Sequence, residues 1–230
     1  VEMIKSCGEE VPNWINEMSD SGIKSFYKFE DGKKKFYDVN SKTYINVPSS
    51  ENHYILDAFR ENNQILKNSE CTVHDIGEGV MCIEFQTKGN SIGEGIAKGI
   101  NEAIDIAERD GWNGIVIGNN EKQFSVGANL MNMGMMAMQK NFDEIEKFLV
   151  GFQKILMRMR TCNVPVVSAT HGFVMGGGLE VSIHCDAGIH ASESYIGLVE
   201  AGVGLIPGGG GTKEMAMSCL LYTSPSPRDT

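Results

Sequence analysis

The chain of 230 residues has no stretch that approaches about 18 uncharged apolar residues, so we predict no membrane-spanning helix. Positive charge is also scarce, because 20 Lys and Arg residues stand against 30 Asp and Glu residues and leave a net charge of −10. Surfaces that bind nucleic acid or an anionic membrane depend on a positive footprint. We therefore expect neither of these partners.

The sequence has no Cys-x-x-Cys pair, although it contains six cysteines. Structural zinc sites and thiol–disulfide catalysts commonly use such pairs, so we expect no metal site built on these thiols. Disulfides are rare in reducing compartments, and dispersed thiols are typical of proteins found there. We therefore predict a cytoplasmic chain whose cysteines are buried and free.

What the chain does contain is an ordinary globular composition, with 41% hydrophobic and 22% charged residues. Apolar segments with strand and helix periods alternate through its larger part. Strands are predicted at residues 71–76, 80–85, 114–117, 164–168 and 187–190, and helices at 93–109, 142–159 and 177–184. Such alternation predicts an α/β layered fold.

The two ends of the chain have a different character. Residues 1–50 include two short aromatic runs that flank an Asp-Gly pair, which is a strong signal for a β-hairpin. Residues 51–70 are polar and are interpreted as a linker. Residues 219–230 follow neither a helical nor a strand period and carry two of the six prolines. We interpret this last segment as a non-native tail derived from a sequencing adapter.

Three glycine-containing segments carry the chemical signal, namely 124–130 (FSVGANL), 171–180 (HGFVMGGGLE) and 196–212 (IGLVEAGVGLIPGGGGT). Glycines let a backbone approach a ligand closely and let N–H groups at a helix start point outward. A phosphate-binding loop would need Gly-Lys-Ser/Thr after the glycines, and a dinucleotide site would need G-x-G-x-x-G. An oxyanion hole, in which free N–H groups stabilise a developing enolate oxygen, fits the pattern better.

Two glutamates in these segments are the candidate catalytic groups. Glu180 closely follows a glycine triplet, and Glu200 has no charged neighbour from residue 196 to 212. Burial of an unpaired carboxylate is costly or raises its pKa, so such a residue is rarely incidental. A serine hydrolase is less favoured, because Ser168 and Ser182 lack suitably spaced His and Asp partners. A metal site is also less favoured, because His184 and His190 are expected to point in different directions from their helix and strand.

A run of five methionines between residues 131 and 138 has two readings. Thioether side chains repack easily, so the run could fill gaps in the core. It could also line a pocket for a flexible acyl chain. The sequence leaves both readings open.

Together the three segments resemble the crotonase (enoyl-CoA hydratase/isomerase) superfamily. They match F-x-x-G-A-D-L, G-x-x-x-G-G-G-x-E and G-L-x-E-x-x-x-G-x-x-P-G-x-G-G-T in that order, except that Asn129 replaces the Asp of the first motif. The resemblance implies a crotonase-type spiral of ββα units over residues 71–218 and an acyl-CoA thioester as substrate.

The resemblance also implies a role for each motif position. The backbone N–H groups of Ala128 and Gly177 would hold the thioester oxygen, Glu180 would orient and deprotonate water, and Glu200 would protonate the α-carbon. Substrate contacts are expected from the neighbouring residues Val126, Gly127, Asn129, Leu130, Gly176, Gly178, Pro207 and Gly208. The substrate itself carries CoA, so no cofactor and no metal are expected in this chain.

Residues 1–50 resemble the end of the helical domain of 3-hydroxyacyl-CoA dehydrogenases. This resemblance implies a bifunctional protein of fatty-acid β-oxidation, cut at both ends here, with its NAD-binding half upstream and a homo-oligomeric assembly. We predict syn addition of water to 2-enoyl-CoA. The alternatives are a Δ3–Δ2 enoyl-CoA isomerase, which would need only Glu200, and a non-catalytic acyl-CoA-binding fragment.

Overall fold

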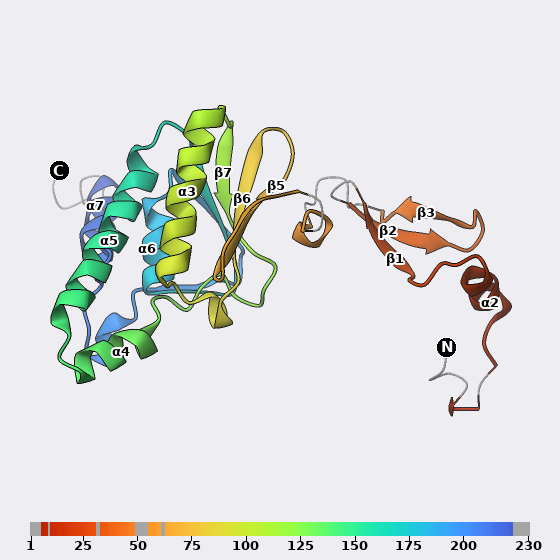
Figure 1. The fold of residues 1–230 in the computed structure, drawn as a ribbon, viewed down its shortest axis with the longest axis horizontal. Coiled ribbons are helices and arrows are strands. Elements are labelled where there is room, and N and C mark those ends of the chain that lie inside the picture. Colours follow the sequence, from red (N-terminus) through yellow and green to blue (C-terminus); the bar gives the residue numbers. More distant parts are fainter. Residues whose placement is uncertain (1–5, 9, 31–32, 49–54, 61–62, 223–230) are drawn as a thin grey trace, which may run out of the picture. The chain divides into compact units, whose positions relative to one another are not determined.

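The computed structural model describes residues 6–8, 10–30, 33–48, 55–60 and 63–222. The chain divides into two compact units, Val1–Glu61 and Asn62–Thr230 (Figure 1). Within the described residues, no helix combines the length and the apolar character needed to cross a bilayer.

The first unit contains a helix and a small antiparallel sheet among its described residues. Helix α2 (Asn13–Asp20) buries Ile15 and Met18. Then follow strands β1 (Tyr27–Glu30), β2 (Lys33–Asp38) and β3 (Thr43–Asn46) and the short helix η1 (Leu56–Ala58). Because β1 and β2 pair in antiparallel register, with Tyr27 opposite Phe36, the predicted hairpin is confirmed. Its Asp-Gly turn at residues 31–32 lies outside the described residues.

The second unit is built on a six-stranded mixed sheet in the order β10-β8-β7-β6-β5-β4. Its strands are β4 (Gln64–Lys67), β5 (Cys71–Asp75), β6 (Val80–Phe85), β7 (Gly114–Ile117), β8 (Val166–Thr170) and β10 (Ala187–His190). Strands β6, β7, β8 and β10 run parallel to one another, whereas β5 is antiparallel to both of its neighbours. Two further strands, β9 (Phe173–Met175) and β11 (Tyr195–Gly197), form a separate parallel pair.

The helices of this unit are α3 (Glu94–Asp110), α4 (Leu130–Met138), α5 (Phe142–Thr161), α6 (Gly177–His184) and α7 (Gly211–Tyr222), with short helices η2 (Lys88–Asn90) and η3 (Glu200–Val203). Helix α3 packs on β5 and β6 and against α5 (Figure 1). Its close approach to β5 depends on Gly99, where a Cβ atom would lie 2.1 Å from Cys71 Sγ. Ile96, Ile100 and Ile104 of α3 are buried in the core, as their helical spacing predicts.

The predicted strands and helices between residues 71 and 190 are all present, with small shifts at their ends. Strand β8 begins at Val166 rather than at residue 164, because Pro165 has no N–H to donate to the ladder. The sheet also begins earlier than predicted. Residues 64–67 were expected to be linker but form β4, since Ile65 and Leu66 pack against the core.

The C-terminal segment differs from the sequence-based expectation in part. Helix α7 continues to Tyr222, so residues 219–222, expected to be aperiodic, are helical. The helix begins at Gly211, and no proline interrupts its backbone hydrogen bonds before residue 225. Residues 223–230, the rest of the proposed adapter-derived tail, lie outside the described residues.

Candidate active site

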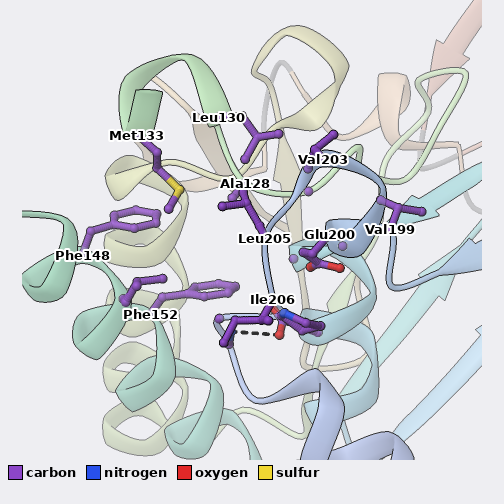
Figure 2. Close-up of a pocket in the computed structure, with 18 of the residues that line it drawn as sticks. Ala128, Leu130, Met133, Phe148, Phe152, Val199, Glu200, Val203, Leu205 and Ile206 are labelled. Atoms are coloured by element: carbon purple, nitrogen blue, oxygen red, sulfur yellow. Dashed lines mark hydrogen bonds between the residues drawn. The ribbon is translucent and has the colours of Figure 1, made fainter. Parts of the chain in front are cut away.

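A pocket of about 450 Å³ lies in the second unit, between helices α4 and α5, the start of α6 and the loop that leads to α7 (Figure 2). Ten of the twelve predicted site residues line it: Val126, Gly127, Ala128, Leu130, Gly176, Gly177, Glu180, Glu200, Pro207 and Gly208. The three glycine-containing segments, which are far apart in the sequence, therefore meet at one cavity.

Two residues that line this pocket, Ala128 and Gly177, carry backbone N–H groups that could bind an oxygen atom. Ile92 donates to Gly127 O at 2.8 Å and accepts from Asn129 N at 3.1 Å, which leaves the intervening Ala128 N–H on the other side of the chain. Gly177 is the first residue of α6, so its N–H has no acceptor within the helix. Neither N–H group donates a hydrogen bond to any residue that the structure describes.

The two N–H groups come close together because glycines allow two loops to touch. A Cβ atom on Gly177 would lie 3.3 Å from Ala128 N. A Cβ atom on Gly127 would lie 2.8 Å from Met175 O and 3.1 Å from Gly177 N, and its φ of +94° is in the left-handed region. A side chain at position 127 would therefore push the two donors apart.

Glu180 lies in the first turn of α6 and is only 2% exposed. Its Oε1 accepts two hydrogen bonds of 2.8 Å, from the N–H groups of Gly209 and Gly211. Burial raises the pKa of the Glu180 carboxyl above its ordinary value, and the nearby charge of Glu200 raises it too, whereas the two amide donors oppose this shift.

Glu200 approaches the pocket from the first residue of η3. A Cβ atom on Gly176, whose φ is +51°, would lie 3.0 Å from Glu200 Oε1. The other oxygen, Oε2, is buried and has no hydrogen-bond partner among the described residues. Figure 2 shows this carboxylate facing the pocket across from Phe148 and Phe152. The two carboxylates thus differ, since one is held by backbone donors and the other has a free buried acceptor.

This combination of groups has a defined chemical capacity. Two free N–H groups can stabilise negative charge that develops on an oxygen atom. Two carboxylates in different environments can accept and deliver protons at adjacent atoms. Among the described residues, no three His, Cys, Asp or Glu side chains gather in a way that could hold a metal ion.

A sequence model of the family described as "Enoyl-CoA hydratase/isomerase" matches residues 75–218. The chain belongs to this family. The resemblance to the crotonase superfamily is therefore confirmed. The enzymes of this family act on acyl-CoA thioesters.

The proteins to which this enoyl-CoA hydratase/isomerase domain is similar are longer than this chain. It is 39% identical over 220 residues to a probable 3-hydroxyacyl-CoA dehydrogenase of Bacillus subtilis, covering 95% of this chain and 28% of that protein. It is 36% identical over 102 residues to a short-chain-enoyl-CoA hydratase of Clostridium acetobutylicum, covering 44% of this chain and 38% of that one. The chain thus spans between about a quarter and two fifths of the length of these relatives.

Solved structures share the fold. An enoyl-CoA hydratase from Polaromonas sp. JS666 superposes with a TM-score of 0.61 at 23% identity, covering 64% of this chain and 58% of that one. An enoyl-CoA hydratase from Geobacillus kaustophilus HTA426 gives a TM-score of 0.59 at 25% identity, covering 66% of this chain and 57% of that one. The predicted crotonase-type α/β fold is confirmed.

Two of the predicted substrate-contacting residues do not line the pocket of this hydratase/isomerase domain. Asn129 caps the start of α4, where its side chain accepts a hydrogen bond from Asn132 N at 3.4 Å. Gly178 faces the protein interior, where a Cβ atom would lie 2.7 Å from Ser125 Cβ. Both residues support the backbone around the pocket and do not face the pocket themselves.

The apolar wall of the pocket was not predicted from the sequence. It consists of Met133, Ile145, Phe148, Leu149, Phe152, Val199, Val203, Leu205, Ile206 and Gly209, and the polar Gln153 borders it. The rings of Phe148 and Phe152 stack with centroids 6.4 Å apart (Figure 2). Of the methionine run, Met133 lines the pocket whereas Met131, Met135 and Met138 are exposed, so the run is only partly a pocket wall.

The serines and histidines that were disfavoured as catalytic or metal-binding residues form hydrogen bonds within the fold. Ser168 Oγ and Ser182 Oγ lie 2.8 Å apart, both buried and hydrogen-bonded to each other. His184 Nδ1 contacts Glu180 O at 2.7 Å, and His190 Nδ1 contacts Thr170 Oγ1 at 2.6 Å. None of these groups lines the pocket.

The raised pKa of Glu180 predicts a pH-dependent cost in stability. A carboxyl whose pKa is higher in the folded chain contributes stability below its ordinary value of 4.5 and loses that contribution as the pH rises through the folded-state pKa. We therefore expect Glu180→Gln to raise the melting temperature at pH 7 and to change it much less at pH 4. Calorimetry at both pH values, with the exposed Glu193→Gln as control, tests this. An equal change at both pH values would contradict it.

Proposed function

We propose that this domain catalyses the syn addition of water to 2-enoyl-CoA thioesters, as the hydratase part of a multifunctional 3-hydroxyacyl-CoA dehydrogenase/hydratase of fatty-acid β-oxidation. The observation that carries the proposal is the pair of carboxylates at one pocket. Glu180 is held through Oε1 by two amides, and Glu200 has a buried Oε2 that no described residue hydrogen-bonds. Hydration needs an oxygen delivered to the β-carbon and a proton delivered to the α-carbon, so it can use both groups.

In the proposed mechanism the thioester oxygen accepts hydrogen bonds from Ala128 N–H and Gly177 N–H. These donors stabilise the negative charge that develops on this oxygen when the β-carbon is attacked. Glu180 orients one water molecule and takes a proton from it as its oxygen bonds to the β-carbon. Glu200, which must be protonated at this step, gives its proton to the α-carbon and becomes a carboxylate. The proton taken up by Glu180 then passes to Glu200, so that one water is added overall and both groups are restored. The apolar wall at Phe148 and Phe152 excludes bulk water and contacts the acyl chain.

The similarity to the Bacillus subtilis dehydrogenase, which extends over nearly the whole chain, supports the proposed parent protein. A relative in Rickettsia felis, named a putative fatty acid oxidation complex trifunctional enzyme, is 30% identical over 179 residues. The 3-hydroxyacyl product of hydration is the substrate class of such a dehydrogenase, so the two activities would act in sequence. NAD binding upstream, homo-oligomeric assembly and cytoplasmic location stay predictions.

An isomerase is the second candidate, and the free Oε2 of Glu200 favours it, because moving a double bond requires only one carboxylate beside an oxyanion hole. Turnover of 2-enoyl-CoA and of 3-enoyl-CoA by the full-length protein separates the two. The first substrate loses its conjugated thioester absorbance on hydration, and the second gains it on isomerisation. We expect hydration to be the faster reaction. Faster isomerisation would favour the second candidate, and acyl-CoA binding without turnover would favour a non-catalytic domain.

A further inference from the structure

The two amide donors to Glu180 belong to an intrinsically soft segment. Gly209 and Gly211 lie in a run of four successive glycines at residues 208–211, and Gly210 has a φ of +101°. Glycine has the largest conformational freedom of all residues, so this run does not by itself hold two N–H groups on one oxygen atom. Something outside the run must fix its geometry.

An ion pair lies directly after this glycine run. Glu214 is in the first turn of α7, and its N–H donates to Gly210 O at 3.1 Å. Its side chain is only 4% exposed and pairs with Arg160 of the last turn of α5. Burial acts to raise the pKa of Glu214, but hydrogen bonds from Arg160 and Lys213 outweigh it and lower this pKa. The carboxylate is therefore ionised at neutral pH.

The same arginine also binds the helix that carries Glu180. Arg160 Nη2 donates to Ile183 O at 3.0 Å, at the end of α6. His184 lies beside this pair: its Nδ1 donates to Glu180 O at 2.7 Å, and its Nε2 is 3.8 Å from Glu214 Oε1, which is too long for a hydrogen bond. Arg160 thus connects the last turns of α5 and α6 to the first turn of α7.

We propose that the Arg160–Glu214 ion pair positions the Glu180 carboxylate. By fixing the first turn of α7 against α6, the pair holds the N–H groups of Gly209 and Gly211 on Glu180 Oε1, which leaves Oε2 to act on water. Arg160 and Glu214 do not line the pocket, so they act through the glycine run and touch no substrate. This inference rests on the proposed hydratase function.

Arg158 offers a matched control on the same helix. It lies two residues earlier in α5, has a similarly exposed side chain (28% against 34% for Arg160) and also forms ion pairs. Its partners, however, are Asn101, Asp105 and Glu108 of α3, far along the chain from the glycine run. Loss of either arginine should therefore cost stability, but only loss of Arg160 should misplace Glu180.

The experiment compares Arg160→Met, Glu214→Gln and Arg158→Met in the full-length protein. We expect the first two to lower kcat for hydration by about 10- to 100-fold with KM changed by less than about threefold, because a small misplacement of a catalytic group has effects of this size. Arg158→Met should leave kcat within about twofold even where it lowers the melting temperature as much. Arg160→Lys, which keeps the charge but not the two-armed contact, should recover part of the loss.

Two further measurements separate positioning from general damage. In a Glu180→Gln background, Arg160→Met should lower kcat by less than about threefold, because the carboxylate that it positions is absent. Hydrogen exchange of the amides at residues 209–211 should be faster in Arg160→Met and Glu214→Gln but not in Arg158→Met. Multiplying effects on kcat, or unchanged exchange, would overturn the inference. A wild-type protein that hydrates no 2-enoyl-CoA would instead refute the proposed function, while the exchange measurement would still test the positioning.

Discussion

Glu180→Gln and Glu200→Gln should each lower the turnover of 2-enoyl-CoA hydration by at least about 10²-fold, within the range ascribed to general acid–base groups. Glutamine has nearly the same shape as glutamate, so the pocket should persist. What is lost is the ability to take a proton from water at position 180 or to give one to the α-carbon at position 200. Acyl-CoA affinity should change little, because it depends mainly on the CoA part and on the N–H donors of Ala128 and Gly177.

The two substitutions should differ in the isomerisation of 3-enoyl-CoA. A double-bond shift needs one proton-transferring group, so Glu180→Gln should be tolerated better than Glu200→Gln. Their effects on hydration should also be non-additive, because the two groups serve the same addition step, one at the β-carbon and one at the α-carbon. Glu193→Gln, on an exposed loop, serves as the control for a change of charge alone. Hydration by Glu180→Gln within a few-fold of wild type would mean that one carboxylate suffices, and the isomerase candidate would then be preferred.

The elements that could be predicted are those whose own sequence carries a pattern, either a helical period or a continuous apolar run. Helix α3 repeats isoleucine at positions 96, 100 and 104, and β7 is a continuous apolar run, so each is recognisable without its neighbours. Strands β9 and β11 were not predicted, because each has only three residues and exists through pairing with the other, as in Ile196 opposite Val174. Strand β4 was also missed. Its two apolar residues, Ile65 and Leu66, lie among polar residues and give too short a pattern to recognise as a strand.

In the candidate site too, some residues could be predicted from the sequence and others could not. The positions of Ala128, Gly177, Glu180 and Glu200 could be proposed because each lies within a motif of fixed spacing, and the structure brings all four to one pocket. The wall formed by Phe148 and Phe152 could not. The helical period of α5 shows that these residues share an apolar face, but it cannot distinguish a face that packs against a sheet from one that borders a cavity. The Arg160–Glu214 pair gave no sequence signal at all, because its partners are 54 residues apart.

Gly127→Ala should abolish most activity without touching either carboxylate. The added Cβ would lie 2.8 Å from Met175 O and 3.1 Å from Gly177 N, at a φ of +94° that alanine rarely adopts. The loop must shift to relieve these contacts, and the shift moves Ala128 N–H away from Gly177 N–H. Loss of one donor of an oxyanion hole costs about 10²- to 10³-fold in kcat, so we expect a loss of that size.

This variant separates the oxyanion hole from the acid–base pair, because hydration and isomerisation both build charge on the thioester oxygen. Gly127→Ala should therefore lower both reactions together, unlike Glu180→Gln. Gly151→Ala is the matched control. Gly151 lies within α5, a Cβ atom there meets no described residue within 4 Å, and the change should raise the free energy of unfolding by about 0.5–1 kcal/mol. Thermal unfolding of both variants checks that the fold is retained. If a folded Gly127→Ala protein isomerised 3-enoyl-CoA at the wild-type rate, Ala128 N–H could not be one of the donors, and the thioester oxygen would have to bind elsewhere in the pocket.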